Sequence, residues 1–61
     1  MTLIKMIQTS KYKWQLTTDN GIILLDGISL DNIYDANEYA ENYVSSFIGW
    51  DFIVIPMEDI C

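Results

Sequence analysis

The side chains of this chain that could do chemistry are carboxylates, lysines and one cysteine, because histidine and arginine are absent. Ser45 and Ser46 stand near Asp51 in the sequence, but a serine nucleophile needs a general base to accept its proton. No histidine can take that role, and no lysine follows Lys13. Glu38 and Glu41 have the residue type of an acid and base pair, but helical periodicity puts both on a water-exposed surface. We therefore expect no catalytic residues and no enzyme.

Potential metal ligands are concentrated in one segment, residues 26–38. The oxygen-bearing side chains there are Asp26, Asp31, Asp35, Asn37 and Glu38. They lack the alternating spacing and the central glycine of a calcium-binding loop, so turns and a helix cap explain them better. The single cysteine, Cys61, has no partner for a disulfide within the chain and is expected to be an inert end residue. The sequence predicts no metal site and no cofactor.

The net charge of −6 comes from three lysines and nine carboxylates, and the two signs are separated along the chain. Lys5, Lys11 and Lys13 precede every carboxylate, the first of which is Asp19. A nucleic-acid-binding protein needs a basic face to replace phosphate counterions, so we do not expect direct binding to DNA or RNA. The longest apolar runs, residues 22–25 and 52–57, are too short to span a membrane. We expect a cytoplasmic protein whose acidity keeps its surface in solution.

Four segments have the composition of β-strands: residues 2–8, 12–17, 22–25 and 51–56. The second segment alternates most clearly, with Tyr12, Trp14 and Leu16 on one side. Residues 18–21 (TDNG) provide a tight turn between the second and third strands. Asp26 and Gly27 are predicted to end the third strand.

One helix is predicted between the third and fourth strands. Asp35 and Glu38 form a capping box at its start, and Gly49 marks its end. The apolar positions repeat with helical spacing and form one stripe: Ala36, Tyr39, Ala40, Tyr43, Val44 and Phe47. The order is therefore β-β-β-α-β, an α+β fold with a small, mostly antiparallel sheet and one helix packed on one face. We expect a single domain over residues 1–61, with a loosely ordered tail at 57–61 and the fourth strand beside the first.

A single helix covers only one face of such a sheet, while three of the four strands are apolar on both sides. The other face would expose a hydrophobic patch, and patches of this kind mark interaction sites. Trp50, just beyond the helix, is expected to contribute at the end of the patch. The predicted contact residues are Ile4 (with Ile7 as the alternative), Ile23, Leu25, Trp50, Ile53 and Ile55.

Residues 35–47 (DANEYAENYVSSF), followed by Trp50, resemble a pattern in short uncharacterised proteins of T4-like marine cyanophages. The resemblance rests on the Tyr-Val-Ser-Ser-Phe run before a tryptophan and is confined to the helical segment. It implies a viral accessory protein made inside a bacterial cell, and it brings no known activity or site.

The function predicted from these observations is that of an accessory, protein–protein interaction module. It would act as a homo-oligomer, with a dimer favoured and a host protein as a possible further partner. Two alternatives stay open. One is an acidic inhibitor that mimics nucleic acid on a host protein, which requires carboxylates gathered on one face. The other is a small enzyme with a site between subunits, which requires a deep pocket there.

Overall fold

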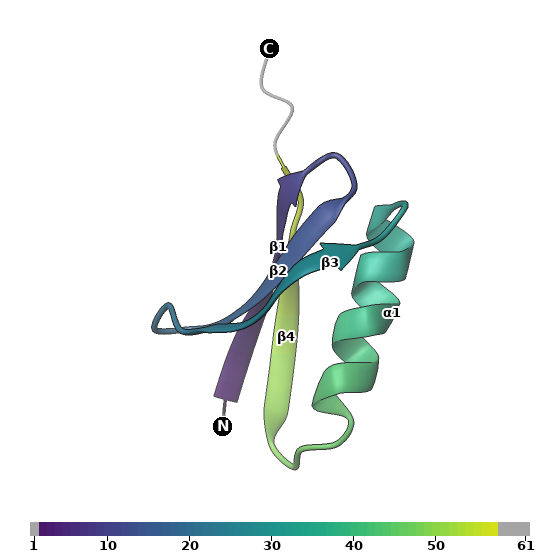
Figure 1. The fold of residues 1–61 in the computed structure, drawn as a ribbon. Coiled ribbons are helices and arrows are strands. Elements are labelled where there is room, and N and C mark those ends of the chain that lie inside the picture. Colours follow the sequence, from purple (N-terminus) through teal and green to yellow (C-terminus); the bar gives the residue numbers. More distant parts are fainter. Residues whose placement is uncertain (1, 58–61) are drawn as a thin grey trace.

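The computed structural model describes residues 2–57 and has the predicted β-β-β-α-β order (Figure 1). The elements are β1 (Thr2–Ser10), β2 (Lys13–Thr18), β3 (Ile23–Ser29), α1 (Ile33–Val44) and β4 (Trp50–Ile55). They form one four-stranded sheet in the order β3-β2-β1-β4, in which β1 and β4 are parallel and the other pairs antiparallel. The predicted fold class and the place of the fourth strand beside the first are confirmed. The predictions for the tail beyond Met57 and for Cys61 lie outside the described residues.

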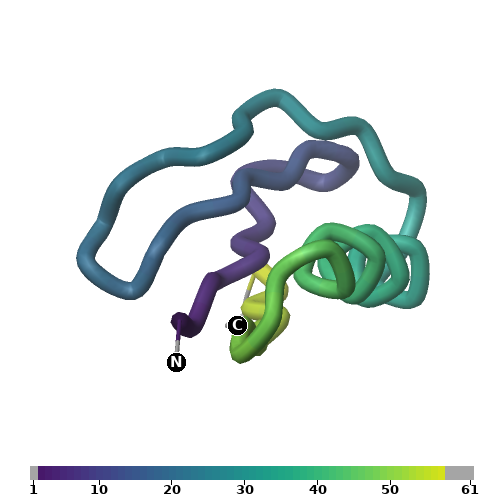
Figure 2. Tube along the Cα trace, turned by 90° about the horizontal axis from the view of Figure 1, so that it is seen from below, coloured from purple at the N-terminus to yellow at the C-terminus, as the bar shows by residue number. Residues whose placement is uncertain are grey.

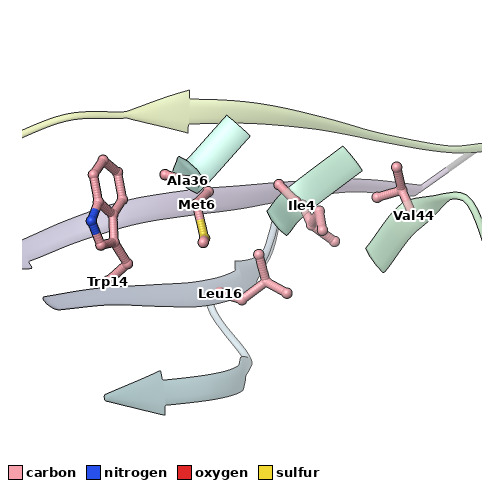
Figure 3. Close-up of a cluster of buried hydrophobic side chains, with 7 residues drawn as sticks. Ile4, Met6, Trp14, Leu16, Ala36 and Val44 are labelled. Carbon is pink, nitrogen blue, oxygen red and sulfur yellow. The ribbon is translucent and has the colours of Figure 1, made fainter. Parts of the chain in front are cut away.

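The hydrophobic core lies between α1 and one face of the sheet. Alternation along β1 and β2 puts Ile4, Met6, Trp14 and Leu16 on this face, and all four are almost completely buried. The helix contributes the small residues Ala36 and Ala40 together with Val44, spaced four apart on one side of α1. Figure 3 shows these side chains meeting in the space between the helix and β1 and β2. Because alanine adds little bulk, α1 can approach the sheet closely.

The N-cap of the helix lies three residues before the predicted cap. Asn32 is the N-cap, and its Oδ1 accepts a hydrogen bond of 2.9 Å from the Asp35 backbone N–H. Asp35 is therefore inside the first turn, where a negative charge is favoured by the helix dipole, and the prediction that it caps the helix is wrong.

The helix also ends earlier than predicted, at Val44 and not next to Gly49. The Phe47 N–H donates to the Val44 carbonyl at 2.9 Å, a tighter turn than an α-helix makes. Phe47 therefore lies beyond α1 and is exposed, as is Tyr39 on the flank of the helix. The prediction of a buried apolar stripe is confirmed for Ala36, Ala40 and Val44. Fewer residues of the helix are fully buried than the sequence predicted.

The third strand does not end at Asp26 and Gly27, as predicted, but runs through them to Ser29. Trp14 and Leu16 of β2 are two residues apart, whereas their partners Ile28 and Leu25 are three apart, so β3 carries an extra residue there. This is a β-bulge, and Gly27 adopts the positive φ of 67° that such a bulge uses.

The bulged strand bends the sheet around the core. Figure 2 views the molecule from below, with α1 on one side of β1 and β4. The chain through β2 and β3 curves around to the start of α1. The sheet thus closes over the core on the helix side. The opposite side of the sheet has no helix on it, as Figure 1 shows.

Candidate interaction surface

The sheet face turned away from α1 is called the open face. Its residues alternate along each strand with the residues that pack in the core. The open face consists of Leu3, Lys5 and Ile7 of β1, Lys13, Gln15 and Thr17 of β2, Ile23 and Leu25 of β3, and Asp51, Ile53 and Ile55 of β4. None of residues 2–57 outside the sheet forms a layer over this face.

Exposed aliphatic side chains lie on the two edge strands of the open face, β4 and β3. On β4, Ile53 and Ile55 are 42% and 37% exposed, and the register places them beside Lys5 and Ile7 of β1. On β3, Ile23 is 54% exposed and lies beside Thr17. Four large aliphatic side chains on one small sheet, including Leu25, form a hydrophobic surface of the kind that marks a contact site.

The centre of the open face is polar, and its polar groups are already bonded within the chain. The Lys5 Nζ lies 3.9 Å from Asp19 Oδ1, and the Lys13 Nζ donates to Ser29 Oγ at 2.8 Å. The Gln15 amide donates to Asp26 Oδ1 at 3.4 Å. Lys5 thus has a countercharge within the chain, whereas the partner of Lys13 is a neutral hydroxyl, so covering Lys13 carries a desolvation cost.

The six predicted contact residues lie in different parts of the fold, and their role in a contact stays a prediction. The structure places Ile23, Leu25, Ile53 and Ile55 on the open face. Ile4 is wrong, because it is 0% exposed and packs in the core under α1. The open-face isoleucine of β1 is Ile7, which the sequence offered as the alternative to Ile4.

Trp50 lies at the start of β4 and belongs mainly to the core side. Its ring stacks on Phe47 with 4.3 Å between centroids and lies 6.4 Å from the ring of Tyr43. This aromatic cluster closes the end of the core next to the turn that follows α1. Trp50 is half-buried there, so the prediction that it joins the exposed sheet patch describes only one side of its ring.

That side of Trp50 lines an open groove of about 670 Å³ at the end of the sheet. The other lining residues are Thr2, Leu3, Thr18, Asp19, Asn20 and Ile22. Of these described residues Asp19 alone carries a carboxylate, whereas general acid–base catalysis by carboxylates needs a pair. The groove thus adds apolar surface beside Leu3, and among residues 2–57 it brings no pair of carboxylates together.

Carboxylates lie on both sides of the molecule: Asp19, Asp26 and Asp51 are on the sheet side with the lysines, and four others are at α1. Asp31, Asp35, Glu38 and Glu41 lie in or next to α1, and the last turn of α1 has no basic residue. The three lysines lie in β1, in β2 and in the turn that joins them. The acidic-inhibitor alternative requires carboxylates on one face; this grouping is compatible with it, and that alternative stays a prediction.

Residues 2–57 contain no cluster of three or more histidine, cysteine, aspartate or glutamate side chains placed to hold a metal ion. Within the same residues, α1 is the one helix, and its 12 residues are too few to cross a membrane.

The sequence predicted that the fourth strand lies beside the first, but it did not predict the register that positions the residues of the open face. The register sets Lys5 beside Ile53 and Thr17, and Thr17 beside Ile23, so Lys5 and Thr17 together lie between the aliphatic parts on β4 and β3. The parallel pairing of β1 with β4 determines this arrangement, and no local pattern in the sequence encodes it.

No family model, curated protein or solved structure matches this chain, so its function has to be argued from the geometry just described.

Proposed function

We propose that this protein is a protein–protein interaction module that associates with itself through the open face. The observation that supports the proposal most strongly is the group of exposed aliphatic side chains, Ile23, Leu25, Ile53 and Ile55, on a sheet face without a helix. Covering such side chains removes apolar surface from water at about 25 cal/mol per Å². In a domain this small, that gain is a large share of the total stability.

The biological setting of the proposal follows from the resemblance of the helical segment to cyanophage proteins. In that setting the module is a viral accessory protein that works in the cytoplasm of a bacterial host. A host protein is then a second class of partner for the same surface or for the acidic helix.

The experiment that tests self-association is light scattering over a concentration series, with wild-type protein and two lysine variants. Ile53→Lys places a charge in the middle of the aliphatic group on β4. Ile48→Lys is the matched control, because Ile48 is fully exposed in the turn before β4 and lies outside the open face. Circular dichroism establishes that both variants are folded.

The expected result is a wild-type mass that rises with concentration above that of one chain. The Ile53→Lys variant stays at the mass of one chain, and Ile48→Lys behaves as the wild type does. An Ile53→Lys variant that associates as strongly as the wild type contradicts the proposed contact surface.

A further inference from the structure

We infer that the turn between β2 and β3 is a site of spontaneous covalent modification, at which Asn20 loses its side-chain amide and becomes isoaspartate or aspartate. Asparagine is a thermolabile residue type, and Asn20 is the one asparagine of the chain that is followed by a glycine, Gly21. Asn32, Asn37 and Asn42 precede isoleucine, glutamate and tyrosine. The reaction occurs within one chain, so it is independent of the self-association proposed above.

The nucleophile of this reaction is the backbone nitrogen of Gly21. Once its N–H has lost the proton to hydroxide, the nitrogen bonds to Asn20 Cγ, the Cγ–Nδ2 bond breaks, and Nδ2 takes a proton and leaves as ammonia. Water then opens the cyclic imide at either of its carbonyls. Opening at the backbone carbonyl gives isoaspartate, in which the chain runs through Cγ, and opening at Cγ gives aspartate. The net change consumes one water and releases one ammonia, so no oxidant or cofactor is needed.

Water and hydroxide have access to the turn. Asp19, Asn20, Gly21 and Ile22 are all exposed. A Cβ placed on Gly21 would meet no atom within 4 Å, so the surroundings of this residue are open. Gly21 also has no side chain of its own to hinder the approach of its nitrogen to Asn20 Cγ. Attack is therefore favoured at Asn20 over the other asparagines, each of which is followed by a bulkier residue.

The backbone hydrogen bonds of the turn hold Asn20 in a conformation that slows the reaction. The Gly21 N–H donates to the Thr18 carbonyl at 3.0 Å, and the Thr18 N–H donates to the Ile22 carbonyl at 2.8 Å. Asp19 and Asn20 have negative φ while Gly21 has a φ of 93°, so the loop is a type I turn followed by a glycine bulge. Asn20 then has a ψ of about 0°, which rotates the Gly21 nitrogen away from the plane that ring closure requires. The turn has to open before Asn20 can react.

The hydroxyl of Thr18 adds a second restraint, on the side chain of Asn20. It accepts a hydrogen bond of 2.9 Å from the Ile22 N–H and donates its own proton to Asn20 Oδ1. Thr18 is half-buried at the end of β2, so its side chain is itself held in place. Thr18 is therefore a positioning residue that fixes the Asn20 carboxamide in the closed turn. The rate of modification in the folded chain then depends on how often the turn opens.

The product places a new carboxylate beside the groove at the end of the sheet. Asn20 lines that groove together with Asp19 and Trp50. The modified chain has one more negative charge than the −6 of the unmodified chain, and the new charge lies next to Asp19 in the sequence. Isoaspartate also lengthens the backbone of the turn by one carbon, so the turn cannot keep its type I geometry. The chain thus acquires with time a more acidic and altered hairpin tip.

Mass spectrometry of the full chain, incubated at neutral and at higher pH, tests the modification. Replacing NH₂ by OH raises the mass, and fragmentation locates the change and distinguishes isoaspartate from aspartate. We expect both products at Asn20, while Asn37 and Asn42, which are also exposed, stay unmodified over the same period. Because the nucleophile is a deprotonated amide, the rate should rise by up to about tenfold per pH unit. Modification of Asn20 that is no faster than that of Asn37 and Asn42, or a rate independent of pH, overturns the inference.

The restraint by Thr18 is tested with a matched pair of variants, whose folding is established by circular dichroism. Thr18→Val removes both hydrogen bonds of the hydroxyl with little change of shape. We expect Asn20 to be modified roughly fivefold faster in this variant, which corresponds to the loss of about 1 kcal/mol of hydrogen bonding. Thr2→Val is the control, because Thr2 lines the same groove but lies outside the turn. It should react at the wild-type rate.

Unfolding in urea removes the turn and provides the reference rate. Wild type and Thr18→Val should then react equally fast, and both should react faster than the folded wild type. A folded Thr18→Val variant that reacts no faster than the wild type contradicts the restraint by the hydroxyl. A folded wild-type chain that reacts as fast as the unfolded one contradicts the restraint by the turn.

Discussion

Substitution of two isoleucines by alanine tests the assignment of the two sheet faces. Ile4 is 0% exposed and lies between the sheet and α1, whereas Ile53 is 42% exposed on the open face. Truncating a fully buried isoleucine costs about 2–5 kcal/mol, because a cavity remains in the core. Truncating a side chain that keeps nearly half of its surface in water costs roughly 1 kcal/mol in the single chain. We therefore expect Ile4→Ala to destabilise the chain at least twice as much as Ile53→Ala.

The assay is urea unfolding followed by tryptophan fluorescence, since Trp14 reports directly on the core. Protein concentration is kept low so that association contributes little to the measured stability. Because a domain of this size has only about 5 kcal/mol of stability, Ile4→Ala keeps about 0–3 kcal/mol, which shortens the folded baseline of its unfolding curve. Ile4→Val, expected to cost about 0.5–1.5 kcal/mol, keeps the comparison measurable.

The same variants separate stability from association. Ile4→Val should leave the concentration dependence of the mass unchanged, and Ile53→Ala should weaken association. Equal losses of unfolding free energy in Ile4→Ala and Ile53→Ala would refute the assignment of the faces. So would an Ile4→Val variant that stays folded but no longer associates.

Three further predictions concern the elements that build the fold. Asn32→Ala removes the helix cap and should lower the stability measured in a thermal melt by about 1 kcal/mol. Asp35→Ala should lower it less, because Asn32 supplies the capping oxygen. A larger loss in Asp35→Ala than in Asn32→Ala would show that Asp35 is the cap. In Gly27→Ala the added methyl group meets no neighbouring atom, but alanine must adopt a φ of 67°. We therefore expect the free energy of unfolding in urea to fall by roughly 1 kcal/mol. An unchanged unfolding midpoint would contradict the bulge. Ala40→Leu overfills the contact between α1 and the sheet and should lower stability by about 1–3 kcal/mol in the same assay; a stabilised variant would show unfilled space there.

The parts of the fold that follow from local patterns could be predicted from the sequence. Alternation in residues 12–17 identified β2 and its buried Trp14 and Leu16, and the turn before Gly21 identified the hairpin. The spacing of Ala36, Ala40 and Val44 identified the buried side of α1. Each of these signals comes from residues within a few positions of one another, so no long-range information was needed.

The errors arose where two local signals competed. Asn32 and Asp35 both have residue types that cap helices, and only the hydrogen bond of the fold shows that Asn32 does so. Asp26 and Gly27 are typical of a turn and equally of a bulge within a strand. The pairing of β3 with β2 shows that they form a bulge.

The candidate surface was predictable only in part for a related reason. Residues 2–8 are apolar on both sides, so alternation alone could not decide whether Ile4 or Ile7 faces the helix. The position of α1 over β1 and β4 settles that choice. The bonds that satisfy Lys5 and Lys13 join residues far apart in the chain, and the fold alone brings those residues together.

The most direct test of the central claim is sedimentation equilibrium of the wild-type chain from micromolar to millimolar concentration. A sheet face with exposed Ile23, Leu25, Ile53 and Ile55 predicts a reversible rise from the mass of one chain to that of two, with no larger species. A constant mass of one chain over the whole range would contradict the claim that this face is a contact surface.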